Sequence, residues 1–237
     1  MHVSRAAFQC RQLSICIGAG KVRQSTPRKP SRPAAQEKGD KMPTTISDND
    51  SAVTERLEPI RIFQLGSKVI REKAAVIGVP LGDADIQLIE TMIVAMRQKG
   101  LVGIAAPQVG QSKRVFISEI RANRRGVPED ALRIFINPEI ISYSDEKQVD
   151  YEGCGSVADG NLFGEVERSL SVTIRYLDKT GTQKVERFDG PLARIIQHES
   201  DHLDGIVFTD KLFRTATLMS GSEYRRMREE RPVADRV

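Results

Sequence analysis

The sequence predicts an α+β protein, and three observations indicate that class. Two segments carry apolar residues at helical spacing, one before residue 100 and one after residue 190. Short apolar runs with the length of strands lie between them. One of these runs alternates apolar and polar residues and leads through a tight turn into a partner, as antiparallel strands do. A helix, several strands and a second helix is the order of an α+β domain rather than of a regular βαβ protein.

The first predicted helix lies between Asp83 and Gly100. Asp83 is the expected N-cap, because its carboxylate can accept hydrogen bonds from the free N–H groups of the first turn. Gly100 is expected to end the helix, since glycine adopts the left-handed conformation that closes many helix C-termini. The apolar residues of the expected buried face stand three and four apart, at Ile86, Ile89, Met92, Ile93 and Met96.

The strands are predicted from shorter patterns. Residues 115–117 and 134–136 are apolar runs, and Asn137-Pro138 is expected to end the second of them. Residues 170–176 alternate strictly, which indicates a half-buried antiparallel strand. The DKTG sequence at residues 178–181 predicts a hairpin turn into a further strand over residues 183–188.

A second helix is predicted after Gly190-Pro191, and Asp204-Gly205 is expected to end it. The helical spacing places two polar residues, Glu199 and His202, on the same side as the apolar ones. The residues that share its inner side are Leu192, Ile195, Ile196, Glu199, His202 and Leu203.

Residues 1–50 are expected to form a disordered basic extension, because they show no hydrophobic period and contain four prolines. Residues 1–41 hold nine basic and two acidic residues, a net charge of +7, which leaves −3 for the rest of the chain. The absence of acids before Glu37 and the Arg and Ser content are also typical of an organelle transit peptide. The alternative is that translation starts at Met42.

Composition excludes several classes of protein. No apolar run approaches the roughly 18 residues that a bilayer span requires, so no membrane partner is expected. Three scattered cysteines, Cys10, Cys16 and Cys154, do not form a disulfide framework and indicate a reducing compartment. The mildly acidic body is a poor surface for phosphates, so no sequence-specific nucleic acid is expected as a partner.

The sequence His198-Glu199-Ser200-Asp201-His202 is an H-E-x-x-H motif on the second predicted helix. Residues four apart on a helix lie one turn above each other, so both imidazoles can bind one metal ion. The glutamate between them is then close enough to a metal-bound water to accept its proton. The alternative is a pair of surface histidines at a chance spacing, but the chain holds three histidines in all and two of them lie here.

Such a site needs a third protein ligand. A histidine at the extended-motif position is excluded, because that residue is Phe208. The downstream acids Glu223, Glu229 and Glu230 lie in a charged stretch that is typical of a solvated helix face. Cys154 remains, flanked by glycines that allow close approach, although a single cysteine is more often a small buried apolar residue.

A third segment of interest is residues 103–110, where small residues in series allow the chain to run close to another group. Gln108 is the polar side chain in this apolar stretch. Its amide is either an exposed group on a packed loop or a hydrogen-bond donor aimed at a developing oxyanion.

Three motifs follow one another in order: G-x-A-A-P-Q at residues 103–108, E-G-C-x-S at residues 152–156 and Q-H-E-x-D-H at residues 197–202. This set resembles the peptide deformylase family, and the resemblance extends from about Leu57 to Leu212. It implies mixed antiparallel sheets packed around a central metal-binding helix. It also implies that Cys154, His198 and His202 bind one Fe²⁺ per chain, with Ni²⁺, Co²⁺ or Zn²⁺ as substitutes.

The resemblance implies a reaction as well. The family removes the N-formyl group from the N-terminal methionine of newly synthesised polypeptides and releases formate. Metal-bound hydroxide would attack the formyl carbon, with Glu199 as general acid and base. Gln108 and the backbone N–H of Gly155 match the two donors of the oxyanion hole. N-formyl-methionyl nascent peptides are the expected partners, with transient association with the ribosome.

The sequence departs from the family pattern at three positions. Leu101 stands where the family commonly has a glycine, Gly155 where it has a large apolar residue, and Ala158 where it has a proline. The segment from residue 158 to 165 is about two residues longer than in the compact bacterial type. These changes bear on substrate preference and efficiency rather than on the reaction.

We therefore expect three parts: a basic extension or transit peptide at 1–50, a catalytic metallohydrolase domain at 51–215, and a charged, helical C-terminal tail at 216–237. The expected location is the bacterial cytoplasm, or a mitochondrion or plastid if residues 1–41 are a transit peptide. The motifs leave two competing hypotheses, a general H-E-x-x-H metallopeptidase with a third ligand other than Cys154, and an inactive homologue that acts as a binding module.

Overall fold

The computed structural model describes residues 60–121 and 128–230, which belong to one compact unit. The expected extension at 1–50 and the first residues of the expected catalytic domain lie outside the described residues. Among the described helices, none has the length and apolar character to span a bilayer.

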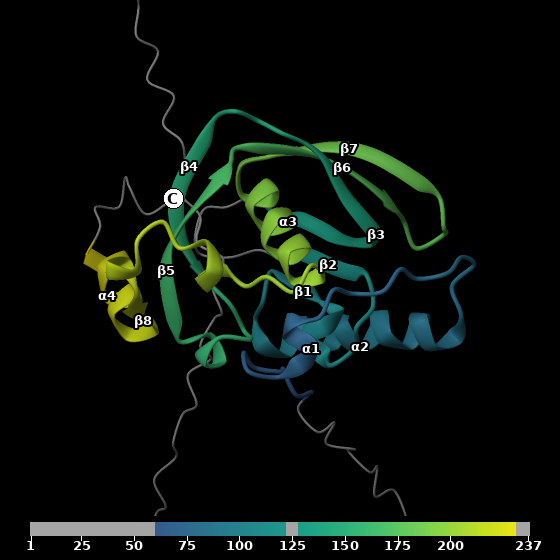
Figure 1. The fold of residues 1–237 in the computed structure, drawn as a ribbon, viewed down its shortest axis with the longest axis horizontal. Helices are drawn as coiled ribbons and strands as arrows, with labels where there is room; N and C mark the ends of the chain where they lie inside the picture. The colour runs from purple at the N-terminus through teal and green to yellow at the C-terminus, as the bar shows by residue number, and fades with distance from the viewer. Residues whose placement is uncertain (1–59, 122–127, 231–237) are drawn as a thin grey trace, which may run out of the picture. The chain divides into compact units, whose positions relative to one another are not determined.

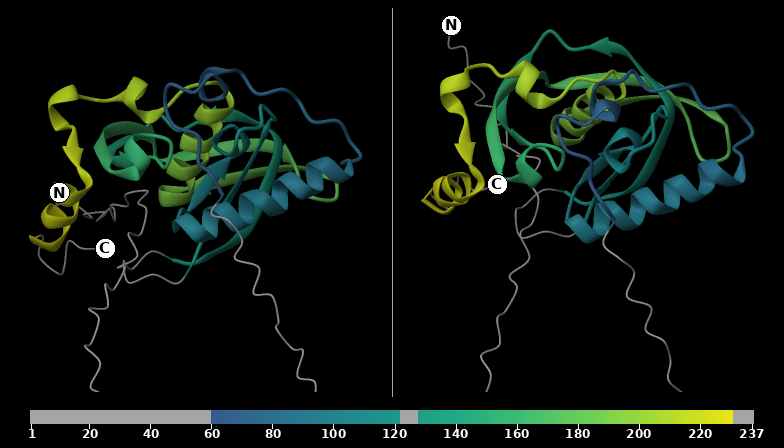
Figure 2. Two further views of the ribbon diagram at one scale, coloured as in Figure 1. Left: turned by 90° about the horizontal axis from the view of Figure 1, so that it is seen from below. Right: turned by 60° about the horizontal axis from the view of Figure 1, so that its bottom comes forward.

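Two antiparallel sheets pack around one central helix in this unit. The larger sheet has the order β1-β2-β3-β6-β7 and the smaller one the order β4-β5-β8. Helix α3 contacts strands of both sheets and lies between them (Figures 1 and 2). The strands are β1 (Gly103–Ala105), β2 (Val115–Ile120), β3 (Asp130–Tyr143), β4 (Lys147–Gly153), β5 (Leu162–Ser169), β6 (Ser171–Leu177), β7 (Gln183–Asp189) and β8 (Met219–Ser220).

Four α-helices are described, together with four short 3₁₀ turns. The α-helices are α1 (Lys68–Arg71), α2 (Asp83–Lys99), α3 (Gly190–Leu203) and α4 (Gly221–Glu230). The 3₁₀ turns are η1 (Ala106–Val109), η2 (Ala158–Gly160), η3 (Phe208–Lys211) and η4 (Thr215–Thr217). The expected α+β class with a central helix is confirmed.

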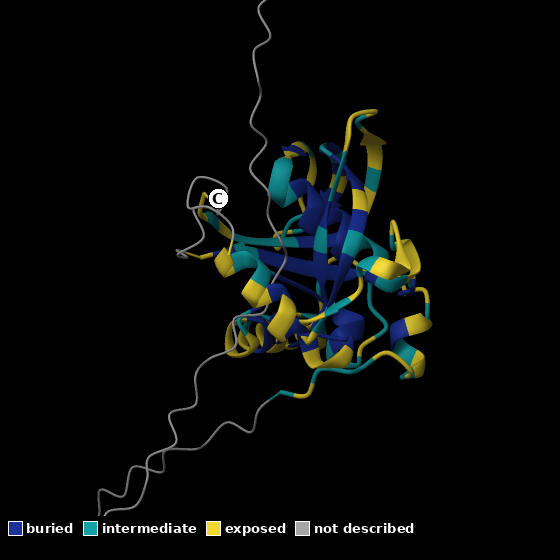
Figure 3. Ribbon diagram, turned by 90° about the vertical axis from the view of Figure 1, so that its left-hand side faces the viewer, coloured by how far each residue is buried: buried dark blue, intermediate teal, exposed yellow. Residues whose placement is uncertain are grey.

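Strand β2 separates the two main apolar clusters. Val115 and Ile117 pack with α2, whereas Phe116 packs with Ile196 of α3 on the other side. Because both faces of β2 are covered, its sequence is a continuous apolar run and not an alternating one. Figure 3 shows this core as dark blue ribbon at the centre, with exposed residues on the outer helices and turns.

The prediction of α2 is confirmed in its extent and wrong by one residue at its start. The N-cap is Gly82, whose N–H donates to the Asp85 carboxylate at 3.2 Å, and Asp83 is the first helical residue. Gly100 ends the helix with φ +66°. The buried face is also rotated from the expected one, with Ile86 46% exposed. The buried residues are Leu88, Ile89, Met92, Ala95 and Met96.

Strand β3 does not end at Asn137-Pro138, as the sequence led us to expect. It continues to Tyr143 because the register with β6 shifts between Ile136 and Glu139, where Asn137 has φ +49°. The Asn137 side chain accepts a hydrogen bond from the Ile77 N–H and donates one to the Ile77 carbonyl, both at 2.8 Å. This irregularity accommodates the proline without ending the strand.

The sequence did not predict β4 and β5, because charged residues occupy their buried faces. Asp150 and Glu152 of β4 and Arg168 of β5 are all at most 6% exposed. A period of two in apolar residues is therefore masked in both strands. The hairpin turn at 178–181 and strands β6 and β7 follow the prediction, with Gly181 at φ +79°.

Residues 216–230 pack on the smaller sheet, and residues 231–237 of the expected tail lie outside the described residues. Strand β8 pairs with β5, and Tyr224 of α4 stacks on Phe163 of β5 with ring centroids 4.3 Å apart. The acidic residues of α4 face outward, including Glu223 and Glu230. The division of the chain at residues 215 and 216 stays a prediction.

Helix α3 ends as predicted, with Asp204 as C-cap and Gly205 at φ +74°. A Cβ atom on Gly205 would lie 2.5 Å from the backbone oxygen of Arg71, so only glycine fits. The replacement Gly205→Ala should therefore lower the free energy of unfolding by about 1–3 kcal/mol, from backbone strain alone. Thermal or urea unfolding measures the loss.

Gly78→Ala is the matched control, because a Cβ atom there meets nothing within 4 Å and φ is not left-handed. It should change stability little or raise it slightly. Equal losses for the two variants would show that neither the left-handed φ of Gly205 nor its close approach to Arg71 requires a glycine.

Candidate metal centre

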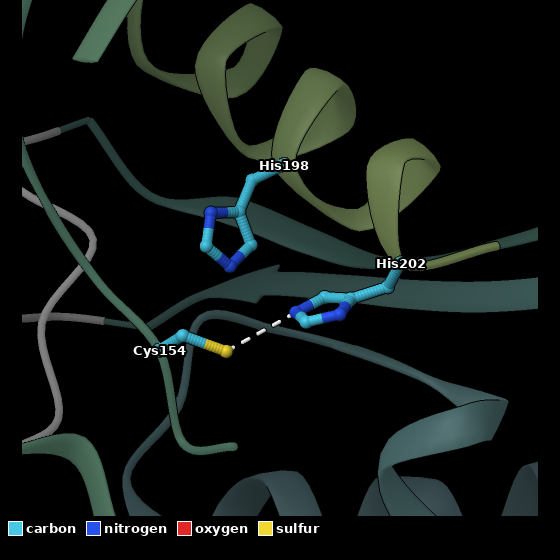
Figure 4. A group of neighbouring side chains, drawn as sticks. All are labelled: Cys154, His198 and His202. Carbon is cyan, nitrogen blue, oxygen red and sulfur yellow. Dashed lines mark hydrogen bonds between the residues drawn. The ribbon is translucent and has the colours of Figure 1, made fainter. Parts of the chain in front are cut away.

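Three side chains from two distant segments converge in the core. Cys154 directly follows β4, and His198 and His202 lie one turn apart on α3. All three are buried, with exposed fractions of 3%, 3% and 1%. The Cys154 Sγ atom lies 3.1 Å from His202 Nε2, and one donor atom of each residue lies within 4.8 Å of the others. Figure 4 shows the three side chains pointing into the same space.

This donor set suits a transition metal. A thiolate and two imidazoles are soft and intermediate ligands, and three protein ligands leave a position open for water or substrate. Burial lowers the pKa of His202 well below its usual range, which keeps its imidazole neutral as a ligand must be. Burial acts the same way on His198, but Cys154 and Glu152 outweigh it and raise the pKa.

Glu152 orients the first histidine. Its Oε2 atom lies 2.9 Å from His198 Nδ1, so Nδ1 donates and the other ring nitrogen faces Cys154 (Figure 4). A carboxylate behind a ligand histidine fixes the tautomer and the ring orientation. Burial acts to raise the pKa of Glu152, but Arg168 and His198 outweigh it and hold that pKa well below its usual range.

Two arginines neutralise this buried carboxylate. Arg168 binds both oxygens of Glu152, at 2.9 and 3.0 Å, and Arg194 of α3 binds one of them at 2.8 Å. Arg168 also donates to Asp201 of α3 at 2.5 Å, and Lys211 pairs with Asp201 at 2.8 Å. The charged cluster therefore ties β4 and β5 to α3 directly behind the metal donors.

Glu199 lies beside the donors in a dry environment. It is 2% exposed, and its Oε2 atom has no hydrogen-bond partner among the described residues. Burial raises its pKa to about 7. A carboxyl group with a pKa near neutrality can both accept and donate a proton.

Gly103 makes room for this carboxylate. A Cβ atom on Gly103 would lie 2.5 Å from Glu199 Oε1. The small residues of the 103–110 segment were expected to allow close approach to another group. The group that approaches Gly103 is the carboxylate of Glu199.

Gln108 is 2% exposed and points toward the same space. Its Oε1 atom accepts a hydrogen bond from the Ala105 N–H at 2.8 Å, which fixes the orientation of the amide. Nε2 then lies 3.6 Å from Cys154 Sγ, as a donor toward the site. The interpretation of Gln108 as an exposed loop residue is wrong.

Gly155 is buried directly after Cys154, and the next residue, Ser156, directs its N–H toward Cys154 Sγ at 3.4 Å.

The structure also explains the departure at Ala158, which has φ +49°. Proline is restricted to φ near −65°, so the family's proline does not fit this backbone. Of the six residues predicted from the sequence, Cys154, His198 and His202 bring their donor atoms together and Gln108 lies against Cys154. The roles of Glu199 and Gly155 stay predictions.

Sequence reasoning missed the residues behind the donors, namely Glu152, Arg168, Arg194 and Asp201. Glu152 and Asp201 stand inside the quoted motifs, but nothing in one sequence shows their partners. Asp150 and Glu152, charged residues at alternate positions of β4, were the signal for a buried polar face.

Comparisons with known proteins identify the family of the chain. A sequence model of the polypeptide deformylase family matches residues 59–217. A peptide deformylase of Pseudothermotoga lettingae is 40% identical over 150 residues, which cover 63% of this chain and 81% of the relative. Peptide deformylase 2 of a Nostoc strain is 38% identical over 173 residues, covering 72% and 95%.

Solved structures of peptide deformylases match the fold. A class I type b peptide deformylase from Acinetobacter baumannii, bound to Met-Ala-Ser, matches with a TM-score of 0.61 and 38% identity over 65% of this chain and 98% of that one. The Thermotoga maritima enzyme matches with a TM-score of 0.58 and 34% identity, over 65% and 98%.

The fold and the donor set define a metal-dependent hydrolase. The family match covers more than half of the sequence, and the chain belongs to the peptide deformylase family. It removes the N-formyl group from newly synthesised polypeptides.

Glu152→Gln should weaken metal binding by about 10–100-fold, because an amide holds His198 less firmly than a carboxylate does. It also leaves Arg168 and Arg194 without their negative partner, so the melting temperature should fall. Competition with a chelator measures the affinity.

Glu167→Gln, on the exposed side of β5, is the matched control, and it should change neither property. Equal metal affinity in Glu152→Gln and the wild type would show that Glu152 does not support metal binding through His198.

Proposed function

We propose that Cys154, His198 and His202 bind one Fe²⁺ ion in this enzyme, with Ni²⁺, Co²⁺ or Zn²⁺ as substitutes. The observation that carries the proposal is the convergence of three buried donor atoms within 4.8 Å beside a buried glutamate. The thiolate favours a transition metal over Mg²⁺ or Ca²⁺. When bound, the metal supplies Lewis-acid chemistry, because it lowers the pKa of water and polarises the formyl oxygen.

Glu199 is the proton carrier of the proposed mechanism. Its carboxylate accepts a proton from the attacking water as the water oxygen bonds to the formyl carbon. The same residue then gives this proton to the amine nitrogen as the C–N bond breaks, which leaves formate and a free amino terminus. Its pKa of about 7 suits both steps. Gly103 holds no side chain that would displace the carboxylate.

Gln108 and Gly155 stabilise the charge that develops on the formyl oxygen. The Gln108 Nε2 donor is already oriented by Ala105, so it need not reorganise during the reaction. The Gly155 N–H would supply the second donor from the chain next to Cys154. Two oriented donors in a site without bulk water stabilise an oxyanion more than they would in water.

Glu199→Ala should keep the metal and lose nearly all turnover. The three donors remain, whereas a proton carrier is worth typically 10²–10⁴-fold in rate. Formate release from formyl-Met-Ala-Ser measures turnover, and metal analysis of the same sample measures occupancy. A variant that kept more than a tenth of wild-type turnover would show that Glu199 does not carry the proton.

Oxygen should inactivate the enzyme purified without air, and Ni²⁺ or Co²⁺ should protect it. The reason is that Fe²⁺ and its thiolate ligand are both oxidisable. The measurement compares the half-life of activity in air for the iron and nickel forms. Full activity after hours in air, with iron still bound, would contradict the proposed native metal.

The identity of the third metal ligand distinguishes the proposed deformylase site, where it is Cys154, from that of a general H-E-x-x-H metallopeptidase. Cys154→Ser should lower metal occupancy and deformylation together. A serine variant with wild-type metal content would favour a different third ligand.

We also propose a location and partners. The relatives named above are bacterial, which supports the bacterial cytoplasm, and nascent formylated chains support transient association with the ribosome. The net charge of −3 after residue 41 supports neither a membrane surface nor sequence-specific nucleic acid as a partner.

Residues 1–45 fused to a fluorescent protein should remain diffuse in a eukaryotic cell. Entry of the fusion into mitochondria or plastids would show instead that residues 1–41 are a transit peptide. Sedimentation of the protein together with ribosomes tests the proposed ribosome association. A protein that stays in the top fraction, apart from the ribosomes, would contradict that association.

A further inference from the structure

Gly155 is a glycine at a place where its own backbone does not require one. Its φ lies outside the left-handed region. A Cβ atom there would meet other atoms only at ordinary contact distances, from 3.5 Å upward. A glycine at position 155 is therefore explained by the space beyond Cβ, which a longer side chain would occupy.

Leu101 fills that space. Both of its Cδ atoms lie 3.5 Å from the Cβ position of residue 155, and Ile62 Cγ2 lies 3.8 Å from it. A leucine at 155 would extend into these atoms. Leu101 and Gly155, two of the three positions at which the sequence departs from the family pattern, are thus neighbours in the structure.

Leu101 is held firmly in its place. Its N–H donates to the carbonyl of Met96 at 2.9 Å, in the hydrogen bonding that ends α2. Its side chain is 7% exposed and belongs to the cluster that contains Met92 and Ile104. A side chain anchored on the end of a 17-residue helix is a stiff support for the neighbouring loop.

The other side of Gly155 is held by its carbonyl. Gln64 Nε2 donates to the Gly155 oxygen at 2.8 Å, and Gln64 Oε1 accepts from the Asp159 N–H at 2.9 Å. The Leu65 N–H donates to the Ser156 oxygen at 2.7 Å. These bonds secure the peptide after Gly155, whereas the proposed oxyanion donor is the N–H before it.

We propose that Leu101 is a positioning residue for the Gly155 N–H, and that it supplies from the end of α2 the side chain that residue 155 lacks. Glycine has the greatest backbone freedom of all residues, so a donor on it needs external support. The Leu101 side chain lies beside Gly155 on one side, while Gln64 donates a hydrogen bond to the Gly155 carbonyl on the other. This inference rests on the proposed role of Gly155 as an oxyanion donor.

Leu101→Ala should lower kcat by roughly tenfold with little change in KM or in metal content. Complete removal of an oxyanion donor costs about 10²–10³ in kcat, and a loosened donor costs less. A loss confined to kcat marks an interaction made only in the transition state.

Leu88→Ala is the matched control, because Leu88 is 8% exposed in the same cluster and does not contact Gly155. It should lose similar stability and keep its kcat. Equal kcat values for the two variants, with formyl-Met-Ala-Ser as substrate, would overturn the inference. An inactive wild-type enzyme would overturn the proposed function, and this inference with it.

A double variant tests the contact itself. Gly155→Leu alone should lower kcat strongly, because its side chain collides with Leu101. The double variant Leu101→Gly with Gly155→Leu exchanges the two side chains and should recover kcat to within about threefold of the wild type, since contacting residues are coupled. A double variant whose loss is the product of the two single losses would overturn the inference. If Leu101→Gly does not fold alone, the comparison of Leu101→Ala with Leu88→Ala decides.

Discussion

The buried carboxylate of Glu152 is the constraint on which the arrangement of the site depends. It is 0% exposed, and an uncompensated carboxylate at such a depth costs several kcal/mol. Arg168 from β5, with Arg194 and His198 from α3, must therefore all lie at its oxygens. Because Glu152 is two residues before Cys154, the same contacts that neutralise it bring the thiol to the histidines. The contacts that compensate the charge of Glu152 therefore also hold the metal donors together in the folded protein.

Close approach of backbone to side chain is the second requirement. Glu199 is dry because α3 lies between two sheets, and Gly103 allows its carboxylate to lie against β1. That burial raises its pKa to about 7. The fold thereby converts an ordinary glutamate into a group that can exchange protons near neutral pH. Gly205 likewise allows close approach at the end of α3, where it lies against the backbone of Arg71.

Much of this arrangement could be predicted from the sequence, and the misses have physical reasons. The two helices and the β6–β7 hairpin follow from spacing and turn chemistry. The three clustered donors, Cys154, His198 and His202, follow from the family resemblance that the three motifs carry. The sequence did not predict β4, since charged residues occupy its buried face, and it misplaced the end of β3, since Asn137 bonds to the distant Ile77. Partners such as Arg168 and Glu152 are 16 residues apart and meet only through strand pairing.

X-ray absorption at the iron edge, on protein purified without air, tests most directly whether Cys154, His198 and His202 bind the metal. The spectrum reports the atoms bound to the metal, whatever the activity of the sample. One sulfur and two imidazole nitrogens, with the sulfur lost in Cys154→Ala, are the predicted ligands, and a lighter oxygen or nitrogen ligand would complete the set. A first shell without sulfur in the active wild-type enzyme would contradict the account.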